Sequence, residues 1–325
     1  MTKVISSSII KAEAQRLGFF TSGIARAERV NETKERDYRE WLREGGHASM
    51  QYLENNLDKR LDPRLLVEGV KSIVCVALNY APSERIPEGE PQIASYALGQ
   101  DYHDVVKNRL RLLAESIGAQ NYRVFCDSAP VMERYWAEQC GLGWIGKSQL
   151  LIIPKAGNMF FLGELFLQEE VDEYDSPVVN RCGTCTKCLD ACPTGALGGE
   201  HFCAERCLSY QTIENRGELS ELAKEKMGDM FYGCDRCVKA CPWNSFATPT
   251  DVEEFRPSPE LLAMTREKWA NLTEEDYRRL FKGSAVKRAK YSGLMRNIKG
   301  MATKDGQTIH GTSAMECGTH STTQE

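Results

Sequence analysis

Residues 182–193 read CGTCTKCLDACP, and residues 234–242 read CDRCVKACP. The first stretch has the spacing Cys-x2-Cys-x2-Cys-x3-Cys-Pro, in which three thiolates hold one iron–sulfur cube and the fourth reaches a second cube. The second stretch lacks the leading cysteine of that pattern, and Cys207 is the natural substitute. Together the two stretches predict two [4Fe–4S] clusters, and hence a protein that moves electrons.

Zinc sites and disulfide bonds are the alternatives for these cysteines. Zinc sites use two Cys-x2-Cys pairs and do not require a Cys-x3-Cys-Pro ending. Disulfide bonds need an oxidising compartment, and nothing in the sequence indicates secretion. Five cysteines lie outside the pattern, and most of them are expected to be small buried hydrophobic residues: Cys75, Cys126, Cys140, Cys203 and Cys317.

The composition is that of an ordinary globular protein. The chain has 325 residues, enough for two domains, with 42% hydrophobic and 27% charged residues. It contains no run of eighteen apolar residues and starts without a secretion signal, so we expect a cytoplasmic protein without a membrane partner. The net charge of −5 argues against nucleic-acid binding by the whole surface but allows a local basic patch.

The apolar pattern ahead of the cysteines predicts helices and strands around one sheet. Residues 72–78, SIVCVAL, form the nearly continuous apolar run that is typical of a buried strand. Further strands are expected at 123–126, 149–153 and 159–166, and helices at 6–17, 35–56, 102–117 and 130–140. Residues 1–178 are therefore expected to form one mixed α/β domain.

Three further parts are expected after this domain. Residues 179–248 have little apolar content and read as a helical, ferredoxin-like insert whose core is the metal. Residues 249–298 have a helical pattern throughout, and residues 299–325 are polar, without periodicity, and expected to be disordered. The predicted fold class is α+β.

Residues 141–148, GLGWIGKS, match the Walker A phosphate loop letter for letter. That loop works only between a preceding strand and a following helix, whose N-terminus faces the phosphates. The order expected here is the reverse, so the match indicates a glycine-rich turn. A functional alternative is close backbone approach to a flat cofactor, with Lys147 reaching it.

Several polar residues have both a structural and a functional interpretation. Asp127 sits where a strand gives way to a helix, and it could cap that helix or serve as a proton donor. The stretch Asp101-Tyr102-His103-Asp104 reads as a helix cap, with a substrate or cofactor contact by His103 as the second possibility. Arg60 is most simply a solvated charge.

The segment from Arg278 to Lys299 is strongly basic. It contains eight basic residues and no acidic one, namely Arg278, Arg279, Lys282, Lys287, Arg288, Lys290, Arg296 and Lys299. A solvated face is the simple explanation. On an acidic chain, however, such segregation points to a phosphate-rich partner such as RNA, with Lys287, Arg288 and Lys290 as candidate contacts.

Over residues 4–298 the chain resembles the epoxyqueuosine reductases, cobalamin-dependent enzymes that complete queuosine in tRNA. The resemblance rests on both cysteine stretches and on DYHD (101–104), DSAPVMER (127–134), GLGWIGK (141–147), RCLSY (206–210), YGCD (232–235) and GSAVKR (283–288). It implies a corrinoid-binding N-terminal domain and a two-cluster domain that delivers electrons to it. The implied reaction is the two-electron reduction of epoxyqueuosine in tRNA to queuosine.

The resemblance also implies roles for single residues. It assigns Cys182, Cys185, Cys188 and Cys241 to one cluster, and Cys192, Cys207, Cys234 and Cys237 to the other. It places Asp127 at the cobalamin as proton donor, with Arg60, Lys147 and Ser209 as further cofactor contacts. The implied partners are tRNA carrying epoxyqueuosine and an electron donor of unknown identity, and the chain is expected to act as a monomer.

Two departures from the family pattern are visible. Some members carry a cysteine near the cobalt, five residues before the Gly-x-Asp-Tyr-His stretch, whereas residues 93–96 here read IASY. Many members continue into helical repeats that this chain lacks. A reductive dehalogenase and a plain iron–sulfur electron carrier are the alternatives, but dehalogenases usually carry an export signal. A carrier does not need some 175 residues of mixed sheet ahead of its clusters.

Overall fold

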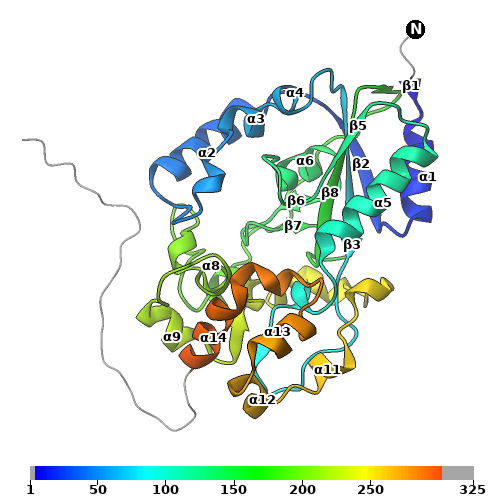
Figure 1. Cartoon of the computed structure of the whole chain (residues 1–325). Coiled ribbons are helices and arrows are strands. Elements are labelled where there is room, and N and C mark those ends of the chain that lie inside the picture. The colour runs from blue at the N-terminus through cyan, green and yellow to red at the C-terminus, as the bar shows by residue number, and fades with distance from the viewer. Residues whose placement is uncertain (1–3, 302–325) are drawn as a thin grey trace, which may run out of the picture.

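The computed structural model describes residues 4–301, which form a mixed α/β fold (Figure 1). Its centre is a four-stranded antiparallel sheet in the order β2-β3-β8-β5. The strands are β2 (Thr21–Arg26), β3 (Ser72–Asn79), β5 (Tyr122–Phe125) and β8 (Phe160–Leu167). The predicted strands at 72–78, 123–126 and 159–166 are confirmed within one or two residues, and β2 is an addition.

The apolar run of β3 is explained by helices on both faces of the sheet. Alternate residues Val74, Val76 and Leu78 pack with α1 (Ser7–Arg16) and α5 (Tyr102–Ser116). The residues between them face the other way and pack with α6 (Glu133–Gln139). A strand that is buried on both faces needs apolar side chains at every position.

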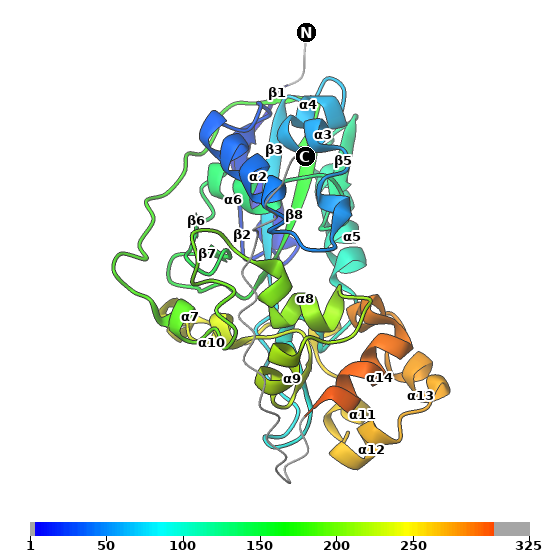
Figure 2. The ribbon, with the colours of Figure 1, turned by 90° about the vertical axis from the view of Figure 1, so that its left-hand side faces the viewer.

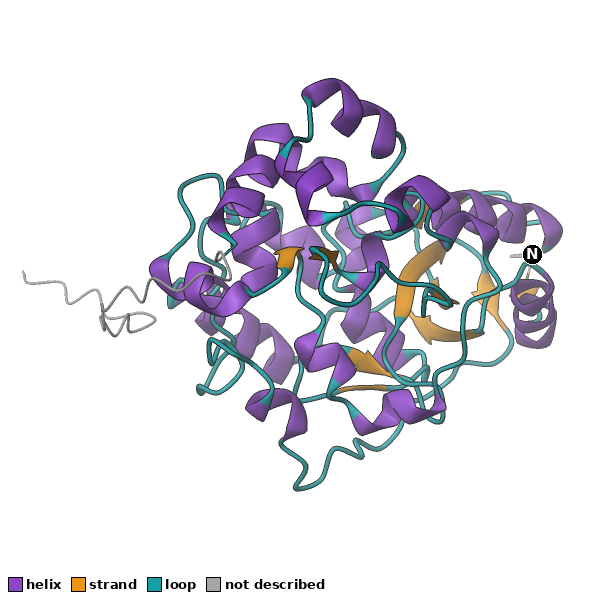
Figure 3. Ribbon diagram, turned by 90° about the horizontal axis from the view of Figure 1, so that it is seen from below, coloured by secondary structure: helices purple, strands orange, loops and turns teal. Residues whose placement is uncertain are grey.

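Shorter elements surround this sheet. The region 35–56, predicted as one helix, holds α2 (Glu32–Arg43) and a turn of 3-10 helix, followed by α3 (Leu57–Leu61) and α4 (Pro63–Leu66). The predicted strand 149–153 shortens to β7 (Leu151–Ile152), which pairs with β6 (Trp144–Ile145). At the far edge β1 (Val4–Ile5) runs parallel to β9 (Glu170–Val171). Seen from below, the longer strands gather on one side of the molecule (Figure 3).

The second half of the chain is mostly helical. It contains α7 (Lys187–Asp190), α8 (Leu208–Ile213), α9 (Glu221–Met227), α10 (Arg236–Lys239), α11 (Pro259–Leu262), α12 (Arg266–Ala270), α13 (Glu274–Leu280) and α14 (Lys290–Gly300). One strand, β10 (Met230–Tyr232), runs parallel to β4 (Gln92–Ile93). In Figure 2, α7 and α10 lie side by side, away from α11–α14.

One apolar core unites parts that the sequence had separated. Residues 208–232 pack with residues 261–301 and with residues 86–98, around the fully buried Phe231 and Trp269. The expectation that metal alone forms the core of the cysteine region is therefore wrong for residues 208–232. The domain limits at 178 and 248 stay predictions.

The predicted tail began too early, because Lys299 and Gly300 belong to α14. Residues 302–325 of the predicted tail, including Cys317, lie outside the described residues. Within the described part of the chain, no helix is both long and apolar enough to cross a membrane.

Candidate active site

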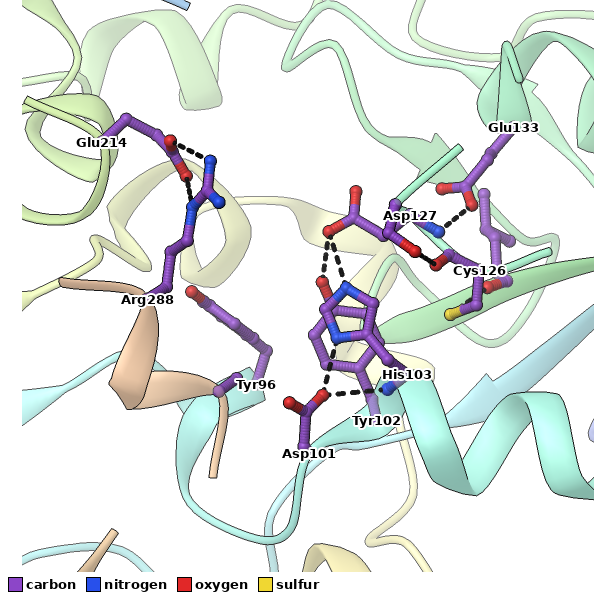
Figure 4. A network of polar contacts seen from close by, with 12 residues as sticks. Tyr96, Asp101, Tyr102, His103, Cys126, Asp127, Glu133, Glu214 and Arg288 are labelled. Carbon is purple, nitrogen blue, oxygen red and sulfur yellow. Dashed lines mark hydrogen bonds and ion pairs between the residues drawn. The ribbon is translucent and has the colours of Figure 1, made fainter. Parts of the chain in front are cut away.

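Asp127 is the centre of a polar network at the end of β5 (Figure 4). Its carboxylate accepts a hydrogen bond of 2.6 Å from the hydroxyl of Tyr102 and lies 3.3 Å from Nε2 of His103. The other ring nitrogen of His103 lies 2.6 Å from the carboxylate of Asp101. The His103 ring is thus held between two carboxylates.

The start of α5 orients these groups. Asp101 is the N-cap of α5 and accepts a hydrogen bond from the backbone N–H of His103. The predicted helix cap is therefore confirmed. The rings of His103 and Phe161 lie on either side of Tyr102, each 4.2 Å away between centroids. Capping and aromatic stacking together direct Tyr102 and His103 toward Asp127.

Asp127 is not a helix cap. Helix α6 begins at Glu133, and its N-cap position is Met132, which makes no side-chain cap. Asp127 instead has a φ of 58°, in the left-handed region that few residues other than glycine, asparagine and aspartate adopt. Its side chain is 57% exposed. The capping interpretation is therefore wrong, and the carboxylate is free to meet a ligand.

The electrostatics of the network place its proton on His103. Burial would lower the pKa of His103, but its hydrogen bonds to Asp101 and Asp127 outweigh burial and raise the pKa to about 9. Burial would raise the pKa of Asp127, but the hydrogen bonds from His103 and Tyr102 hold it below its ordinary value. At neutral pH the pair is an imidazolium and a carboxylate.

Arg288 approaches this network from the C-terminal half of the chain (Figure 4). Its guanidinium makes two hydrogen bonds to Glu214, of 2.9 and 2.7 Å, and lies 5.6 Å from the ring centroid of Tyr52. The Asp127 carboxylate is near enough to contribute to a raised Arg288 pKa, after the larger effect of Glu214. The Tyr52 side chain is 46% exposed.

The basic segment is less free than its sequence suggests. Arg278 pairs with Glu274, Arg279 pairs with Glu260, and Arg288 pairs with Glu214, so acids from outside the segment compensate part of its charge. Arg296 donates hydrogen bonds to backbone carbonyl groups of residues 211–217. The inference of eight uncompensated charges is therefore wrong. Lys287 and Lys290 are exposed and form no ion pair with another described residue.

The eight cysteines form two groups, in which the thiols act on one another's pKa. The first group is Cys182, Cys185, Cys188 and Cys241, and the second is Cys192, Cys207, Cys234 and Cys237. Burial raises the pKa of Cys241, and the other thiols of its group raise it further. Burial likewise raises the pKa of Cys237 to about 12, with the same help from its own group.

The two groups have the same members as the sets that the resemblance implies. Within residues 4–301, no three histidine, cysteine or carboxylate side chains converge closely enough to hold a single metal ion. The remaining described cysteines, Cys75, Cys126, Cys140 and Cys203, are buried as expected.

A short chain of contacts joins the second cysteine group to the active site. Asp235, the neighbour of Cys234, accepts hydrogen bonds of 2.7 and 2.6 Å from the backbone N–H and hydroxyl of Ser95. The next residue, Tyr96, packs edge-on against Tyr102. The Ser95 hydroxyl is thus held by Asp235.

The other predicted cofactor contacts, Arg60, Lys147 and Ser209, differ in burial and in their hydrogen bonds. Arg60 is 9% exposed, and no described residue accepts a hydrogen bond from its Nε, so the solvated-charge interpretation is wrong. Lys147 donates hydrogen bonds of 2.8 and 3.0 Å to the carbonyls of Gly183 and Cys185, in the first cysteine stretch. Ser209 is half-buried on α8. Their contacts with cobalamin stay predictions.

The Walker-like loop follows α6 and is part of the β6–β7 turn, so its reversed context is confirmed. A Cβ on Gly143 would meet the carbonyl oxygen of Ile152 at 2.1 Å, which explains glycine there by close packing of backbone.

Several residues of the site escaped sequence reasoning. Tyr52, Tyr96 and Glu214 reach it from elements far apart in the chain, and nothing in their local pattern marks them. Glu133 and Asp235 lie inside stretches that carry the family resemblance, which was the available signal.

Comparison with known proteins identifies the family of this chain. Residues 60–128 match the family model "Epoxyqueuosine reductase QueG, DUF1730", and residues 181–244 match "4Fe-4S double cluster binding domain". The chain is 44% identical over 302 residues to an epoxyqueuosine reductase of Cellulophaga algicola, covering 91% of this chain and 98% of the relative. It is 45% identical to one of Leadbetterella byssophila, covering 90% and 97%.

Solved structures of epoxyqueuosine reductases are also similar to this chain. A crystal structure of an epoxyqueuosine reductase with an epoxyqueuosine-modified tRNA-Tyr stem loop matches with a TM-score of 0.82 and 28% identity, over 90% of this chain and 79% of that one. The Bacillus subtilis enzyme, captured with its aspartate-containing catalytic loop swung out of the active site, matches with a TM-score of 0.80 and 27% identity, over the same shares. The chain therefore belongs to the epoxyqueuosine reductase family of oxidoreductases.

Proposed function

We propose that this chain reduces epoxyqueuosine in tRNA to queuosine with two [4Fe–4S] clusters and cobalamin. Removal of the epoxide oxygen as water, leaving an alkene, consumes two electrons and two protons. The observation that carries the proposal is the pair of exposed Asp127 and half-buried His103, which a short chain of contacts joins to the second cysteine group. The side chains that would supply protons therefore lie close to the cysteine group that would supply electrons.

We assign the two cysteine groups to the clusters and the residues around Asp127 to cobalamin. Each group of four cysteines would hold one cluster. The orphaned Nε of Arg60 fits a large polar cofactor such as cobalamin, whose amide and phosphate oxygens could accept from it. Exposed Asp127 and half-buried Ser209 are the further candidate contacts. When bound, cobalamin supplies a reducible cobalt that no side chain can replace.

Electron entry is proposed at the first cysteine group. Trp144 donates a hydrogen bond of 3.4 Å to the Cys182 thiol and packs edge-on against Trp243, 5.0 Å away. Trp243 in turn contacts Phe246, which is 52% exposed. An apolar path thus leads from the surface to the first group. An electron donor docking at Phe246 would pass electrons to the first group, then to the second group, which contains Cys234, and then to the active site.

His103 and Asp127 are proposed to deliver the proton to the leaving oxygen. The imidazolium holds the proton, and the Asp127 carboxylate, 3.3 Å away and exposed, can take it and present it to the substrate. Asp101 fixes the ring orientation and stabilises its positive charge. The donor is thus a pair of side chains rather than Asp127 alone.

This proton placement predicts the pH dependence of turnover. The pKa of His103 is raised to about 9, so the imidazolium is present below that value and is lost as pH rises through it. We expect the rate of the chemical step to be level around neutral pH and to fall about tenfold per unit above about pH 9. Single-turnover rates measured across this pH range test whether His103 holds the proton. The control is His103→Gln, whose rate should not show the fall above about pH 9. A wild-type rate that stayed level past pH 10 would contradict it.

The tRNA substrate is proposed to contact the exposed lysines beside the site. Lys287 and Lys290 flank Arg288, which reaches toward Asp127, and unpaired loop bases can be splayed out into such a site. Tyr52 is an exposed aromatic surface on which a base could stack.

Charge reversal of these two lysines tests the tRNA site. Lys287→Glu with Lys290→Glu is expected to weaken binding of the stem loop and to lower the salt slope by roughly one for each phosphate that is no longer bound. Arg288 is left in place because its removal would strand Glu214. The control is Arg111→Glu with Lys155→Glu, because both residues are exposed, form no ion pair with another described residue, and change the net charge equally. Equal binding by wild type and the lysine variant would place the RNA elsewhere.

Cobalamin binding is tested by titrating the cluster-loaded chain with cobalamin under anaerobic conditions and recording visible spectra. We expect saturable binding in wild type and at least about tenfold weaker binding in Arg60→Met, which removes the buried charged donor. Absence of binding by wild type would remove cobalamin from the proposal and favour a plain electron carrier.

A further inference from the structure

Glu164 is a carboxylic acid in the middle of the sheet. It lies on β8 between Cys75 of β3 and Phe125 of β5, and it is completely buried. No N–H or O–H group of the described residues donates to either of its oxygens. The polar group that it meets is the carboxyl of Glu133. Two carboxyl groups can form a hydrogen bond only if one of them carries a proton.

Glu133 connects this buried acid to the active site. It is the first residue of α6, and its Oε1 accepts a hydrogen bond from the backbone N–H of Asp127 (Figure 4). Asp127 has a φ of 58°, and a left-handed residue at the end of a strand persists only where its surroundings hold it. Glu133 is thus placed to hold the backbone, while Tyr102 and His103 hold the side chain.

A completely buried acid beside a second, half-buried acid is a costly feature that an apolar core would avoid. The charged and titratable groups facing it come from β3, α5, α6 and the end of β5, and they are Cys75, His103, Cys126, Asp127, Arg134 and Cys140. Of these, Arg134 is exposed and donates to the backbone carbonyl of Gln149. A hydrogen bond between the two carboxyl groups keeps at least one proton in the pair, so at most one negative charge remains beside the core.

We propose that Glu133 and Glu164 are joined by a carboxyl–carboxyl hydrogen bond and together anchor the loop 126–130 in the position where the Asp127 carboxylate meets His103. Glu164 donates to Glu133 and fixes its rotamer, and Glu133 accepts from the Asp127 N–H. Both are positioning residues, because they act through Asp127. The inference rests on the proposed function only in treating Asp127 as catalytic.

The protonation of the pair agrees with this arrangement. Burial raises the pKa of Glu133 to about 8, and the charge of Asp127 adds to the rise. Burial also raises the pKa of Glu164 well above its ordinary value, with the charge of Glu133 contributing. The pair therefore retains a proton at neutral pH.

The test is hydrogen–deuterium exchange of the backbone in the full, cluster-loaded chain. Glu133→Leu removes the acceptor of the Asp127 N–H. Loss of a hydrogen bond to an acidic group corresponds to a change of at least about tenfold, so backbone exchange of residues 126–130 is expected to accelerate by about that factor or more. Turnover should fall with it, while KM for the tRNA stem loop stays unchanged. Glu133→Gln offers an amide oxygen to Asp127 and an N–H to Glu164, so it should restore slow exchange and most of the turnover.

Glu138→Leu is the matched control. Glu138 also lies on α6 and accepts a hydrogen bond of 2.8 Å from a backbone N–H, but that of Ile145. Its replacement should leave exchange at residues 126–130 unchanged. Wild-type exchange in Glu133→Leu, or exchange in Glu133→Gln as fast as in Glu133→Leu, would overturn the proposal. A fully active Asp127→Asn enzyme would instead overturn the catalytic role of Asp127 and leave the exchange result standing.

Discussion

Replacement of Cys234 by alanine is expected to halve the iron content of the protein and to abolish turnover. The two cysteine groups predict about eight irons and eight sulfides per chain, and removal of one ligand in the second group should leave about four of each. Cys234 neighbours Asp235, which binds Ser95 next to the active site, so the missing cluster would be the one that we propose passes electrons to the substrate. Anaerobic iron and sulfide analysis after reconstitution, with turnover measured on the same sample, checks both parts.

Cys140→Ala is the matched control for this prediction. Cys140 is buried against the sheet, outside both groups, so its replacement should keep all of the iron. A Cys234→Ala protein with a full complement of iron and normal turnover would show that this thiol is not a ligand. Stoichiometric zinc in the wild type, in place of iron, would refute the cluster assignment as a whole.

Asp127→Asn is expected to lower the rate of the chemical step at least ~10²-fold, the usual contribution of one well-placed acid. Asparagine has nearly the same shape, tolerates the left-handed backbone at this position and can still accept from Tyr102. It cannot take the proton from His103. Clusters, cobalamin affinity and stem-loop affinity should therefore stay at wild-type levels while single-turnover rates fall.

The control for Asp127→Asn is Asp104→Asn, which changes an exposed carboxylate in the first turn of α5. Turnover of that variant should match wild type. If Asp127→Asn also turned over normally, the proton would reach the substrate without Asp127, and His103 would be the candidate to donate it directly.

The sequence predicted those helices and strands whose burial leaves a pattern in their own residues. The apolar run at 72–78 and the helical period at 102–117 correspond to β3 and α5, because burial of a strand on both faces and of one helix face leaves a mark in the sequence. Strand β2 was missed because TSGIAR contains few strand-favouring residues, and its pairing with β3 decides its conformation.

Features that depend on distant contacts could not be predicted. The basic segment looked uncompensated because Glu214 and Glu260 join it only in the folded chain. Asp127 looked like a helix cap because its sequence neighbours, Ser128 and Pro130, are typical of a helix start, whereas tertiary contacts direct its side chain to Tyr102 and His103. The cysteine spacing, by contrast, predicted the cluster domain well, because ligand spacing is a local property.

The most direct measurement is product formation by the whole chain. Protein reconstituted with iron, sulfide and cobalamin is mixed anaerobically with a low-potential reductant and an anticodon stem loop that carries epoxyqueuosine, and the nucleosides are then analysed by mass spectrometry. We predict conversion of epoxyqueuosine to queuosine, with removal of one oxygen atom, only when both cobalamin and the clusters are present. Equal conversion without cobalamin, or unchanged epoxyqueuosine with a fully loaded and reduced protein, would contradict the proposed function.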